Sequence, residues 1–500
     1  GNPSTDVTFK IDNADPLSLA NQVPALDWLR NIEAEVSASF VVELNEDARP
    51  KQMSGVLDFG AGRLRATPSS SAAAFKQAKA YFEFDAVADV LEFSNFSMDT
   101  SLGVVSGSAS SQLARDLAGH VIGATTDLKI DRLSLTQPKL FQDAITFENG
   151  RAKVEISFEP FHVNLVKGVL NHRDLSIVAN GDLWAQEKYW QSKFDLRLDQ
   201  ISANQVKEFW PLTFIPKTRK WVSQNLQQGQ VQDLHGFFNR QDGVAEFDFS
   251  FAFDDVKTGI VKTMEPVHGA QGEGSLNQDQ LTLNLAQGYL TPLNGTQLDL
   301  SGSLFHIPNI NTRPAIGQIT LAAAGDLQSA LKVLDIPKFR YIEKFGQTTD
   351  FASGQTSVLG WLEVPLTKDV KKGQIKFNMS GIATDVSSDK LVKGRKLRSK
   401  QIAFQVSDKG LNLSGNATLD SVPAKFNWSQ AFVDNPTQVS QLNSSLTLNQ
   451  QALDVFNVSL PDGSFSGSTP ASFNVKLLPQ KPAAFDLTSN LKGATLRIDS

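Results

Sequence analysis

The sequence predicts a mostly β protein built from antiparallel strands, with a few short helices. Three observations lead to this fold class. Apolar and polar residues alternate with a period of two in segment after segment, which is the pattern of a strand with one buried face. Turn-forming residues separate these segments, as in DKG at 408–410 and QDG at 241–243. Clear helical periodicity is confined to two short stretches.

The alternating segments occur along the whole length of the chain. Strands are expected at 34–44, 151–158, 192–198, 245–253, 280–285, 373–381, 400–407, 410–419 and 471–477. The segment AEFDFSFAF at 245–253 has the strongest pattern, because four phenylalanines alternate with smaller or polar residues. The apolar residues expected on one face in three of these strands are Phe247, Phe249, Phe251, Phe253, Ile375, Phe377, Met379, Ile402, Phe404 and Val406.

Two segments show helical spacing instead. In GDLQSALKVLDIPKF, at 325–339, apolar residues recur every three or four positions, with Asp326 as the expected N-cap and Pro337 beyond the end. The other is FWPLTFIPKTRKWVSQNLQQGQVQDLHG, at 209–236, which predicts one amphipathic helix with Gly229 at its C-terminal cap. A helix amid so many strands calls for an explanation.

Composition and charge exclude several classes of protein. The chain has 500 residues, of which 41% are hydrophobic and 20% charged, so it has ample material for a core. Its net charge of −6 is spread along the chain, which argues against nucleic acid as a partner. Cysteine is absent, which removes thiolate nucleophiles, cysteine metal sites and disulfides. No run approaches the roughly 18 apolar residues of a membrane span.

Motifs of catalysis or metal binding are not found in the sequence. The histidines, at 120, 162, 172, 235, 268 and 306, form no HExxH or paired-ligand spacing. No nucleophile elbow, phosphate loop or dinucleotide fingerprint is present. The acidic pair Asp254 and Asp255 is expected in a solvated turn at a strand end. We therefore expect no enzymatic activity, no cofactor and no metal.

The apolar strand faces need a cover. Burying one large apolar side chain is worth roughly 1.5 to 3 kcal/mol, so four phenylalanines on one face would cost about 6 to 12 kcal/mol in water. One cover is a second sheet or a helix, giving a closed sandwich or barrel. The other is an oily ligand, such as lipid acyl chains, lying in an open curved trough. Periodicity alone favours the closed core, and the 33 phenylalanines against 4 tyrosines shift the balance only slightly toward the trough.

An ordered series of motifs resembles a known family. The residues Trp210, Pro211, Thr218, Arg219, Trp221, Val222, Asn225, Leu226, Gly229 and Val231 are similar to the signature helix of the AsmA-like envelope proteins, in their YhdP-like branch. GWLEVPLTKDV at 360–370, DKLVKGRKL at 389–397 and the segment at 408–428 resemble the central region of that family in order and spacing. The series as a whole, and no single motif, carries the resemblance over most of the chain.

The resemblance implies a fold and a function. The fold is an elongated, curved antiparallel sheet that forms an apolar groove. The function is a non-enzymatic one in the periplasm of a Gram-negative bacterium, moving phospholipids between the inner and outer membranes or maintaining the outer-membrane barrier. Such proteins are anchored in the inner membrane, so this chain is expected to be a fragment whose anchor lies outside it. The alternative is a β-rich envelope scaffold that binds other proteins and no lipid; an all-β hydrolase or glycan-binding module is a weaker third reading.

The resemblance also suggests how the chain is divided. We expect one continuous architecture with an N-terminal groove segment at 1–204, a helical signature insert at 205–240 and a C-terminal groove segment at 241–500. The insert either closes or curves the groove, or is a plain packing helix. The expected partners are phospholipid acyl chains, the inner membrane and other envelope proteins.

Candidate site residues follow from these expectations. The ten same-face apolar residues named above are expected to line the groove. Contacts to lipid headgroups at its rim are expected from Arg219, Lys220, Lys393, Arg395, Lys396 and Arg398. For the basic run at 390–400, a solvated hairpin between two strands is the simpler alternative.

Overall fold

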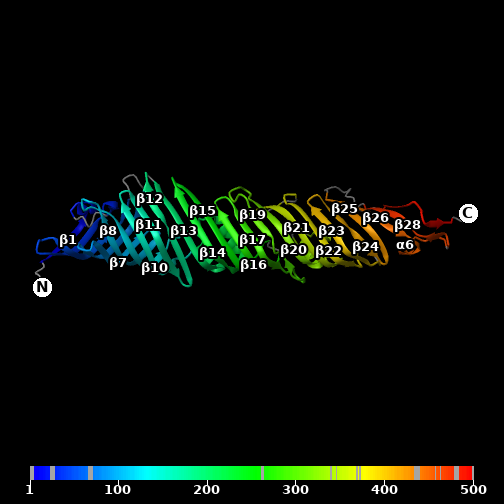
Figure 1. Cartoon of the computed structure of the whole chain (residues 1–500), viewed down its shortest axis with the longest axis horizontal. Coiled ribbons are helices and arrows are strands. Elements are labelled where there is room, and N and C mark those ends of the chain that lie inside the picture. The colour runs from blue at the N-terminus through cyan, green and yellow to red at the C-terminus, as the bar shows by residue number, and fades with distance from the viewer. Residues whose placement is uncertain are drawn as a thin grey trace. The chain divides into compact units, whose positions relative to one another are not determined.

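The computed structural model describes most of the chain (Figure 1). The described residues are 5–22, 29–65, 71–187, 189–260, 264–337, 340–344, 346–367, 370, 373–392, 394–432, 440–456, 458–461, 463–477 and 484–497. Within them, 28 strands belong to one sheet, and two further strands, β27 and β30, pair with each other. The pairings described below are antiparallel, so the predicted mostly β, antiparallel fold class is confirmed.

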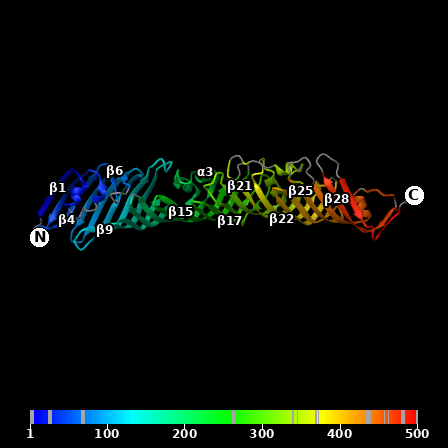
Figure 2. The same ribbon diagram turned by 90° about the horizontal axis from the view of Figure 1, so that it is seen from above.

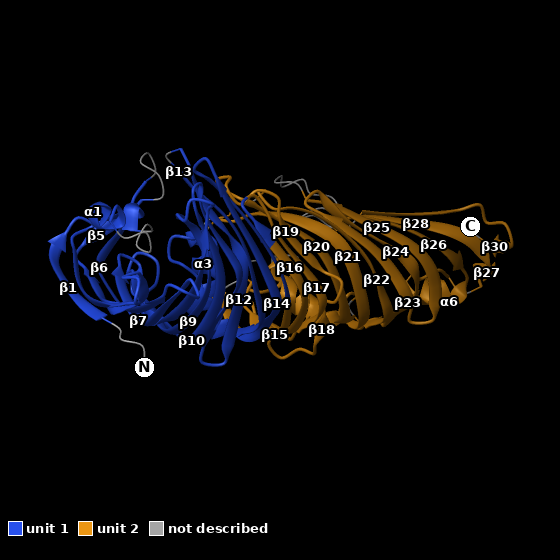
Figure 3. Cartoon of the chain, turned by 60° about the vertical axis from the view of Figure 1, so that its left-hand side comes forward, with its two compact units in different colours: residues 1–224, 228–252, 276–278 blue, residues 225–227, 253–275, 279–500 orange. Residues whose placement is uncertain are grey.

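The chain divides into two compact units (Figure 3). Unit 1 comprises residues 1–224, 228–252 and 276–278. Unit 2 comprises residues 225–227, 253–275 and 279–500.

The strands up to β15 are mostly those of unit 1. They are β1 (Thr5–Ala14), β2 (Ile32–Glu33), β3 (Val36–Leu44), β4 (Pro50–Phe59), β5 (Gly62–Leu64), β6 (Ala73–Asp85), β7 (Val90–Thr100), β8 (Gly103–Arg115), β9 (Val121–Leu135), β10 (Ile145–Phe158), β11 (Phe161–His172), β12 (Leu175–Gln186), β13 (Tyr189–Ser202), β14 (Leu226–Gln241) and β15 (Val244–Thr258). From β6 to β14 each strand pairs with the next one in the chain.

The later strands are mostly those of unit 2. They are β16 (Val267–Asn277), β17 (Leu281–Leu290), β18 (Leu298–Asp299), β19 (Leu304–Ile307), β20 (Ile316–Asp326), β21 (Ser353–Pro365), β22 (Lys376–Ser388), β23 (Leu397–Ser407), β24 (Gly410–Leu419), β25 (Val422–Ala431), β26 (Ser440–Leu448), β27 (Phe465–Gly467), β28 (Thr469–Leu477), β29 (Ala484–Ser489) and β30 (Ala494–Leu496). From β20 to β26 each strand again pairs with its successor, and the colours of Figure 2 follow this order.

The described helices are short. They are α1 (Pro16–Ala20), α2 (Ala203–Phe209), α3 (Pro216–Asn225), α4 (Leu327–Leu334), α5 (Tyr341–Lys344) and α6 (Gln450–Val455). The helix predicted around 325–339 is confirmed as α4, and the Asp326 side chain caps it by accepting a hydrogen bond from the backbone N–H of Ser329.

The prediction for 209–236 was wrong in two respects. The stretch contains α3 but is preceded by a second helix, α2, which the sequence pattern did not reveal. Helix α3 ends at Asn225 and β14 begins at once, so Gly229 lies within a strand and caps no helix. Its φ of +123° is a backbone angle that favours glycine.

Bulges bend the sheet in both units. In β10 of unit 1, Asn149 has a φ of +55° and the register against β11 shifts beside it. In β22 of unit 2, Asp385 has a φ of +51° and the register against β21 shifts in the same way. Asn and Asp tolerate this left-handed conformation better than other residues with side chains, and a bulge bends its strand. The strands of each unit are accordingly curved (Figure 3).

A bulge also explains one error of the sequence reading. Asp255, expected with Asp254 in a turn at a strand end, lies inside β15 and has a φ of +47°. The Asp254 carboxylate accepts a hydrogen bond from the Gln271 side chain at 2.5 Å. The pair therefore marks an irregularity within the sheet.

Closed apolar cores are present in part of each unit. In unit 1, the buried cluster includes Leu29, Val36 and Leu57, with 0%, 0% and 1% of their surface exposed. In unit 2, Ala452 and Leu453 of α6 are 0% and 2% exposed against β25, β26 and β28. Helices therefore seal the apolar face locally, as the closed-core alternative requires, but only over part of its length.

Candidate apolar binding face

Strand register brings the predicted apolar residues of unit 2 onto one face. Met379 of β22 stands directly opposite Val406 of β23, and one row further on Phe404 stands opposite Gly381. Directly paired residues point to the same side of a sheet. Because Ile402 lies two residues before Phe404 in β23, it shares this side. The prediction of a common face in β22 and β23 is confirmed.

The same face continues across four more strands. Phe404 pairs with Leu413, which pairs with Trp428 of β25. Trp428 pairs with Leu442 of β26, which in turn pairs with Val475 of β28. We call the unit 2 face the half-buried residues Met379, Ile402, Phe404, Val406, Leu413, Phe426, Trp428, Leu442, Phe473 and Val475.

The face differs from a closed core in its burial. Each of its ten members is half-buried, whereas the core residues under α6 are buried. The residues between them in the strands, such as Gln405, Asn412 and Asn427, are exposed on the opposite side. One side of this part of the sheet is therefore polar and exposed to solvent, and the other is apolar and partly open.

Glycines shape the floor of the unit 2 face. A Cβ atom on Gly381 would lie 2.4 Å from Cζ of Phe404, and one on Gly360 would lie 2.6 Å from Sδ of Met379. Both large side chains therefore lie across the backbone of the neighbouring strand, which only glycine permits.

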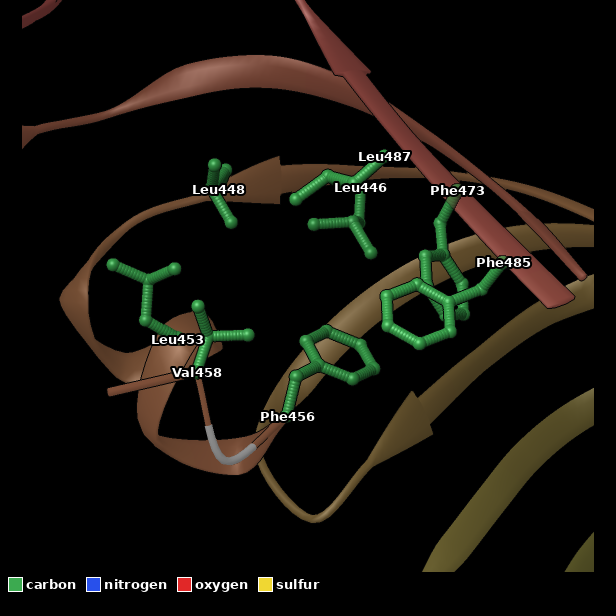
Figure 4. A pocket seen from close by; sticks show the side chains of 8 residues that line it. All are labelled: Leu446, Leu448, Leu453, Phe456, Val458, Phe473, Phe485 and Leu487. Atoms are coloured by element: carbon green, nitrogen blue, oxygen red, sulfur yellow. The ribbon is translucent and has the colours of Figure 1, made fainter. Parts of the chain in front are cut away.

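A partly open pocket lies near the last strands of unit 2 (Figure 4). It has a volume of about 150 Å³ and lies between α6 and strands β26, β28 and β29. Its lining residues are Leu446, Leu448, Leu453, Phe456, Val458, Phe473, Phe485 and Leu487. A pocket of this size and apolar lining can accommodate an apolar group of about benzene size.

Aromatic contacts build the open side of this pocket. The ring centroids of Phe456 and Phe473 are 5.5 Å apart, and those of Phe473 and Phe485 are 6.0 Å apart. Phe473 belongs to the unit 2 face as well, so the pocket and the face share a side chain. Phe485 is 66% exposed, which leaves the entrance accessible.

Unit 1 carries a similar apolar face on β15, but here another segment covers it. Phe247, Phe249 and Phe251 alternate along the strand and are half-buried. The ring of Phe214, from the connection between α2 and α3, lies 4.7 Å from that of Phe247 and 6.0 Å from that of Phe249. Phe249 also packs edge-on against Phe238 at 5.2 Å.

The remaining predicted lining residues are also half-buried. Phe377 pairs with Leu362 of β21, and Ile375 immediately precedes β22. Phe253 lies in the part of β15 that belongs to unit 2, where a Cβ atom on Gly272 would come within 2.8 Å of its ring. All ten predicted residues thus occupy partly open positions, and their role in binding stays a prediction.

The two predicted rim residues of the helical insert, Arg219 and Lys220, differ in their surroundings. The Nε atom of Arg219 donates a hydrogen bond to the carbonyl oxygen of Trp210 at 2.9 Å, so this half-buried side chain holds the local backbone. Lys220 is exposed. Lys393 lies outside the described residues.

The other rim residues lie around the turn between β22 and β23. Arg395 forms an ion pair with Asp420 at 3.1 Å, and the backbone N–H of Lys396 donates to the same carboxylate at 2.8 Å. These contacts, the backbone hydrogen bond first, lower the pKa of Asp420. The side chains of Lys396 and Arg398 are exposed. Part of the basic run is thus neutralised locally.

A further ion pair fixes the same turn. Lys390 donates to the carboxylate of Asp350 at 2.5 Å, and Thr348 donates to it as well. The hydrogen bond from Lys390, followed by that from Thr348, lowers the pKa of Asp350 to about 2. Two acidic residues therefore anchor a turn that the sequence shows only as a cluster of positive charge.

The histidines and carboxylates were also compared with metal-binding arrangements. In the described part of the chain, no group of three or more His, Asp or Glu side chains could hold a metal ion. His172, the buried histidine, packs against Phe147 and Phe209 and lies 2.6 Å from the carbonyl oxygen of Thr146 through Nδ1. Its surroundings are those of a packing residue.

Sequence reasoning missed several residues of the site. The unit 2 face extends through Leu413, Phe426, Trp428, Leu442 and Phe473, which were not among the candidates. The signal was present, because the sequence AKFNW at 424–428 alternates like its neighbours. The pocket under α6 could not be predicted, since its residues come from a helix and three strands that meet only in the folded chain.

Comparison with known proteins supplies one match. A family model described as YhdP protein matches residues 89–498, which is most of the chain. A search of the curated proteins and a search of the solved structures each found no match. No helix among the described residues is both long enough and apolar enough to cross a membrane.

Proposed function

The chain belongs to the YhdP family, and on that premise we propose that it binds phospholipid acyl chains along its apolar faces. It acts without catalysis in the periplasm of a Gram-negative bacterium, where it moves phospholipids between the inner and outer membranes or maintains the outer-membrane barrier. An inner-membrane anchor outside the present sequence tethers it. Family membership supports the envelope role, and the apolar faces support lipid as the ligand.

The observation that carries the proposal is the unit 2 face. Ten large apolar side chains on neighbouring strands remain half-buried, and their side of the sheet leads to a pocket lined by carbon atoms. Contiguous apolar surface of this kind marks a site of interaction. An acyl chain fits its chemistry because these ten side chains offer it apolar contact area.

The energetics suit reversible transfer. Moving a methylene group from an apolar environment into water costs about 0.8 kcal/mol, so an acyl chain of about 16 carbons would lose about 12 kcal/mol by leaving a bilayer for water. Contact with a partly open apolar face offsets much of this free-energy cost without enclosing the acyl chain. The lipid can therefore leave a membrane and still slide along the protein.

The polar side and the exposed cations complete the proposal. Most of the residues that alternate with the face are polar and exposed, which keeps the opposite side of the sheet in water. Lys220 and Lys396 are exposed and available for anionic headgroups, at about 1 kcal/mol for each charge near a lipid surface. Arg219 and Arg395 contribute less, because each already bonds within the protein.

Photo-crosslinking tests the proposal at two adjacent positions. Phe426 belongs to the unit 2 face, whereas Asn427 is exposed on the opposite side. A photo-crosslinking amino acid that replaces Phe426 should give phospholipid adducts after irradiation in cells, identified by mass spectrometry. The same amino acid in place of Asn427 should give none. Equal adducts at both positions, or none at either, would favour the alternative of a lipid-free envelope scaffold.

A further inference from the structure

Helix α2 is firmly attached to the sheet of unit 1. Ser202 and Gln205 form a capping box at its start. At its end, the ring of Phe209 lies 5.8 Å from that of Phe147 and 5.2 Å from that of His172, both of which are buried. This end of the insert therefore packs as part of the core.

The next part of the insert is held differently. None of the residues of α3 is buried. The indole N–H of Trp210 donates to the carbonyl oxygen of Phe214 at 2.7 Å, and Arg219 donates back to Trp210. These bonds lie within the insert and fix its shape. A backbone hydrogen bond from Leu212 to the carbonyl oxygen of Leu140, 2.7 Å long, joins it to the rest of unit 1.

This part of the insert, residues 210–225, we call the cover segment. Its ring at Phe214 rests on Phe247 and Phe249, and Phe249 in turn rests on Phe238. α3 lies within the curve of the unit 1 strands (Figure 3). The apolar face of unit 2 is partly open. The similar apolar face on β15 of unit 1 is instead covered by a side chain of the protein itself.

We infer that the cover segment and a lipid acyl chain compete for the same apolar surface at Phe247 and Phe249. Both partners offer hydrocarbon to the same rings, and the rings cannot be covered twice. Because α2 and β14 hold the two ends of the segment and no residue of α3 is buried, Phe214 can move off the sheet while α2 and β14 stay in place. The insert is therefore a gate for unit 1, and this inference rests on the proposed lipid-binding function. A lipid displaces the cover segment because it binds the uncovered state more tightly than the covered state. The difference between these two binding free energies sets how far the equilibrium shifts.

Because the chain contains no cysteine, the gate can be locked by a chosen pair of thiols. Phe214→Cys and Phe247→Cys are combined in the full chain and joined by a bifunctional thiol reagent with a reducible spacer. A photo-crosslinking amino acid at Phe238 reports lipid in unit 1. We expect phospholipid adducts to fall at least about tenfold in the linked protein and to return when the spacer is reduced.

A matched pair controls for the linkage itself. Phe209→Cys and Phe147→Cys, whose rings are 5.8 Å apart in the native protein, link the anchored helix α2 to the sheet. Linking this pair should leave lipid adducts at Phe238 unchanged. If both linked pairs reduce the adducts equally, or neither does, the gate is refuted.

Opening the gate should have the opposite effect. Phe214→Ala removes the covering ring and should raise the adducts at Phe238 about tenfold, which corresponds to about 1.4 kcal/mol. Thr213→Ala, an exposed neighbour, should leave them unchanged. Adducts at Phe426 but none at Phe238 in any variant would refute the gate alone. Their absence at both positions would refute the proposed function, and with it the gate.

Discussion

Replacing Phe404 by aspartate is the most direct test of the unit 2 face. Phe404 is half-buried in the middle of β23, with its ring across Gly381 of the neighbouring strand. The substitution puts a carboxylate where a lipid acyl chain is proposed to lie. Gln405→Asp introduces the same charge at the next residue, on the exposed side of the sheet.

The structure gives the expected magnitudes. Full burial of a phenylalanine is worth about 1.5 to 3 kcal/mol, so losing a half-buried one costs about half of that in folding free energy. Binding suffers far more, because a carboxylate beneath an acyl chain must lose its hydration at a cost of several kcal/mol. Since each 1.4 kcal/mol is a factor of ten, lipid occupancy should fall at least about a hundredfold.

The assay combines lipid adducts with a test of folding. Phospholipid adducts at Phe426 are compared in the native chain, in Phe404→Asp and in Gln405→Asp, and circular dichroism melting follows the folded state. We expect adducts to vanish only in Phe404→Asp, with its strand signal retained. A folded Phe404→Asp protein with native adducts, or an equal loss in Gln405→Asp, would show that the face does not hold lipid.

Three further predictions concern packing and pH. Gly381→Val should displace the Phe404 ring and lower the free energy of unfolding by about 1 to 3 kcal/mol, seen as a lower melting temperature and weaker lipid adducts. Leu453→Ala, at a side chain 2% exposed in α6, should cost about 2 to 5 kcal/mol in the same melting assay. Because the hydrogen bond from Lys390 lowers the pKa of Asp350 from 3.8 to about 2, its stabilisation is complete above pH 4 and is lost as the pH falls toward 2. Melting as a function of pH measures this loss.

Each of these has a matched control. Ser380→Val, exposed on the other face of β22, should leave melting and adducts near native. Asp454→Ala, on the exposed side of α6, should cost far less than the leucine substitution. Asp350→Asn should remove the acid-dependent component of the melting curve, and a variant that keeps it would assign that component to another carboxylate.

The sequence predicted the strands well because their signal is local. In β15, β22 and β23 the period-two alternation states which residues share a face, and antiparallel pairing with a neighbour then aligns Met379 with Val406. Helix α4 was equally accessible, since its cap at Asp326 and its apolar spacing lie within a few residues. Local patterns therefore sufficed for these strands, their apolar faces and α4.

The rest depended on contacts that no local pattern encodes. Helix α2 was missed because its seven residues are too few to show a helical period. Bulges such as that at Asp385 change which side the following residues face, and a regular alternation cannot foresee them. The same holds for Phe214, whose role follows from the rings it meets some 30 residues later in the chain.

Pairing of strands with their immediate successors has a consequence for how such a chain grows. From β21 to β26 each strand bonds to the one made just before it, so assembly can proceed in the order of synthesis with only short loops to close. Removing or duplicating two adjacent strands would leave the remaining strands running in their original directions, with their apolar side chains still on the same face of the sheet. Descendants of such a gene can therefore lengthen or shorten by whole hairpins, much as solenoids evolve by whole repeats.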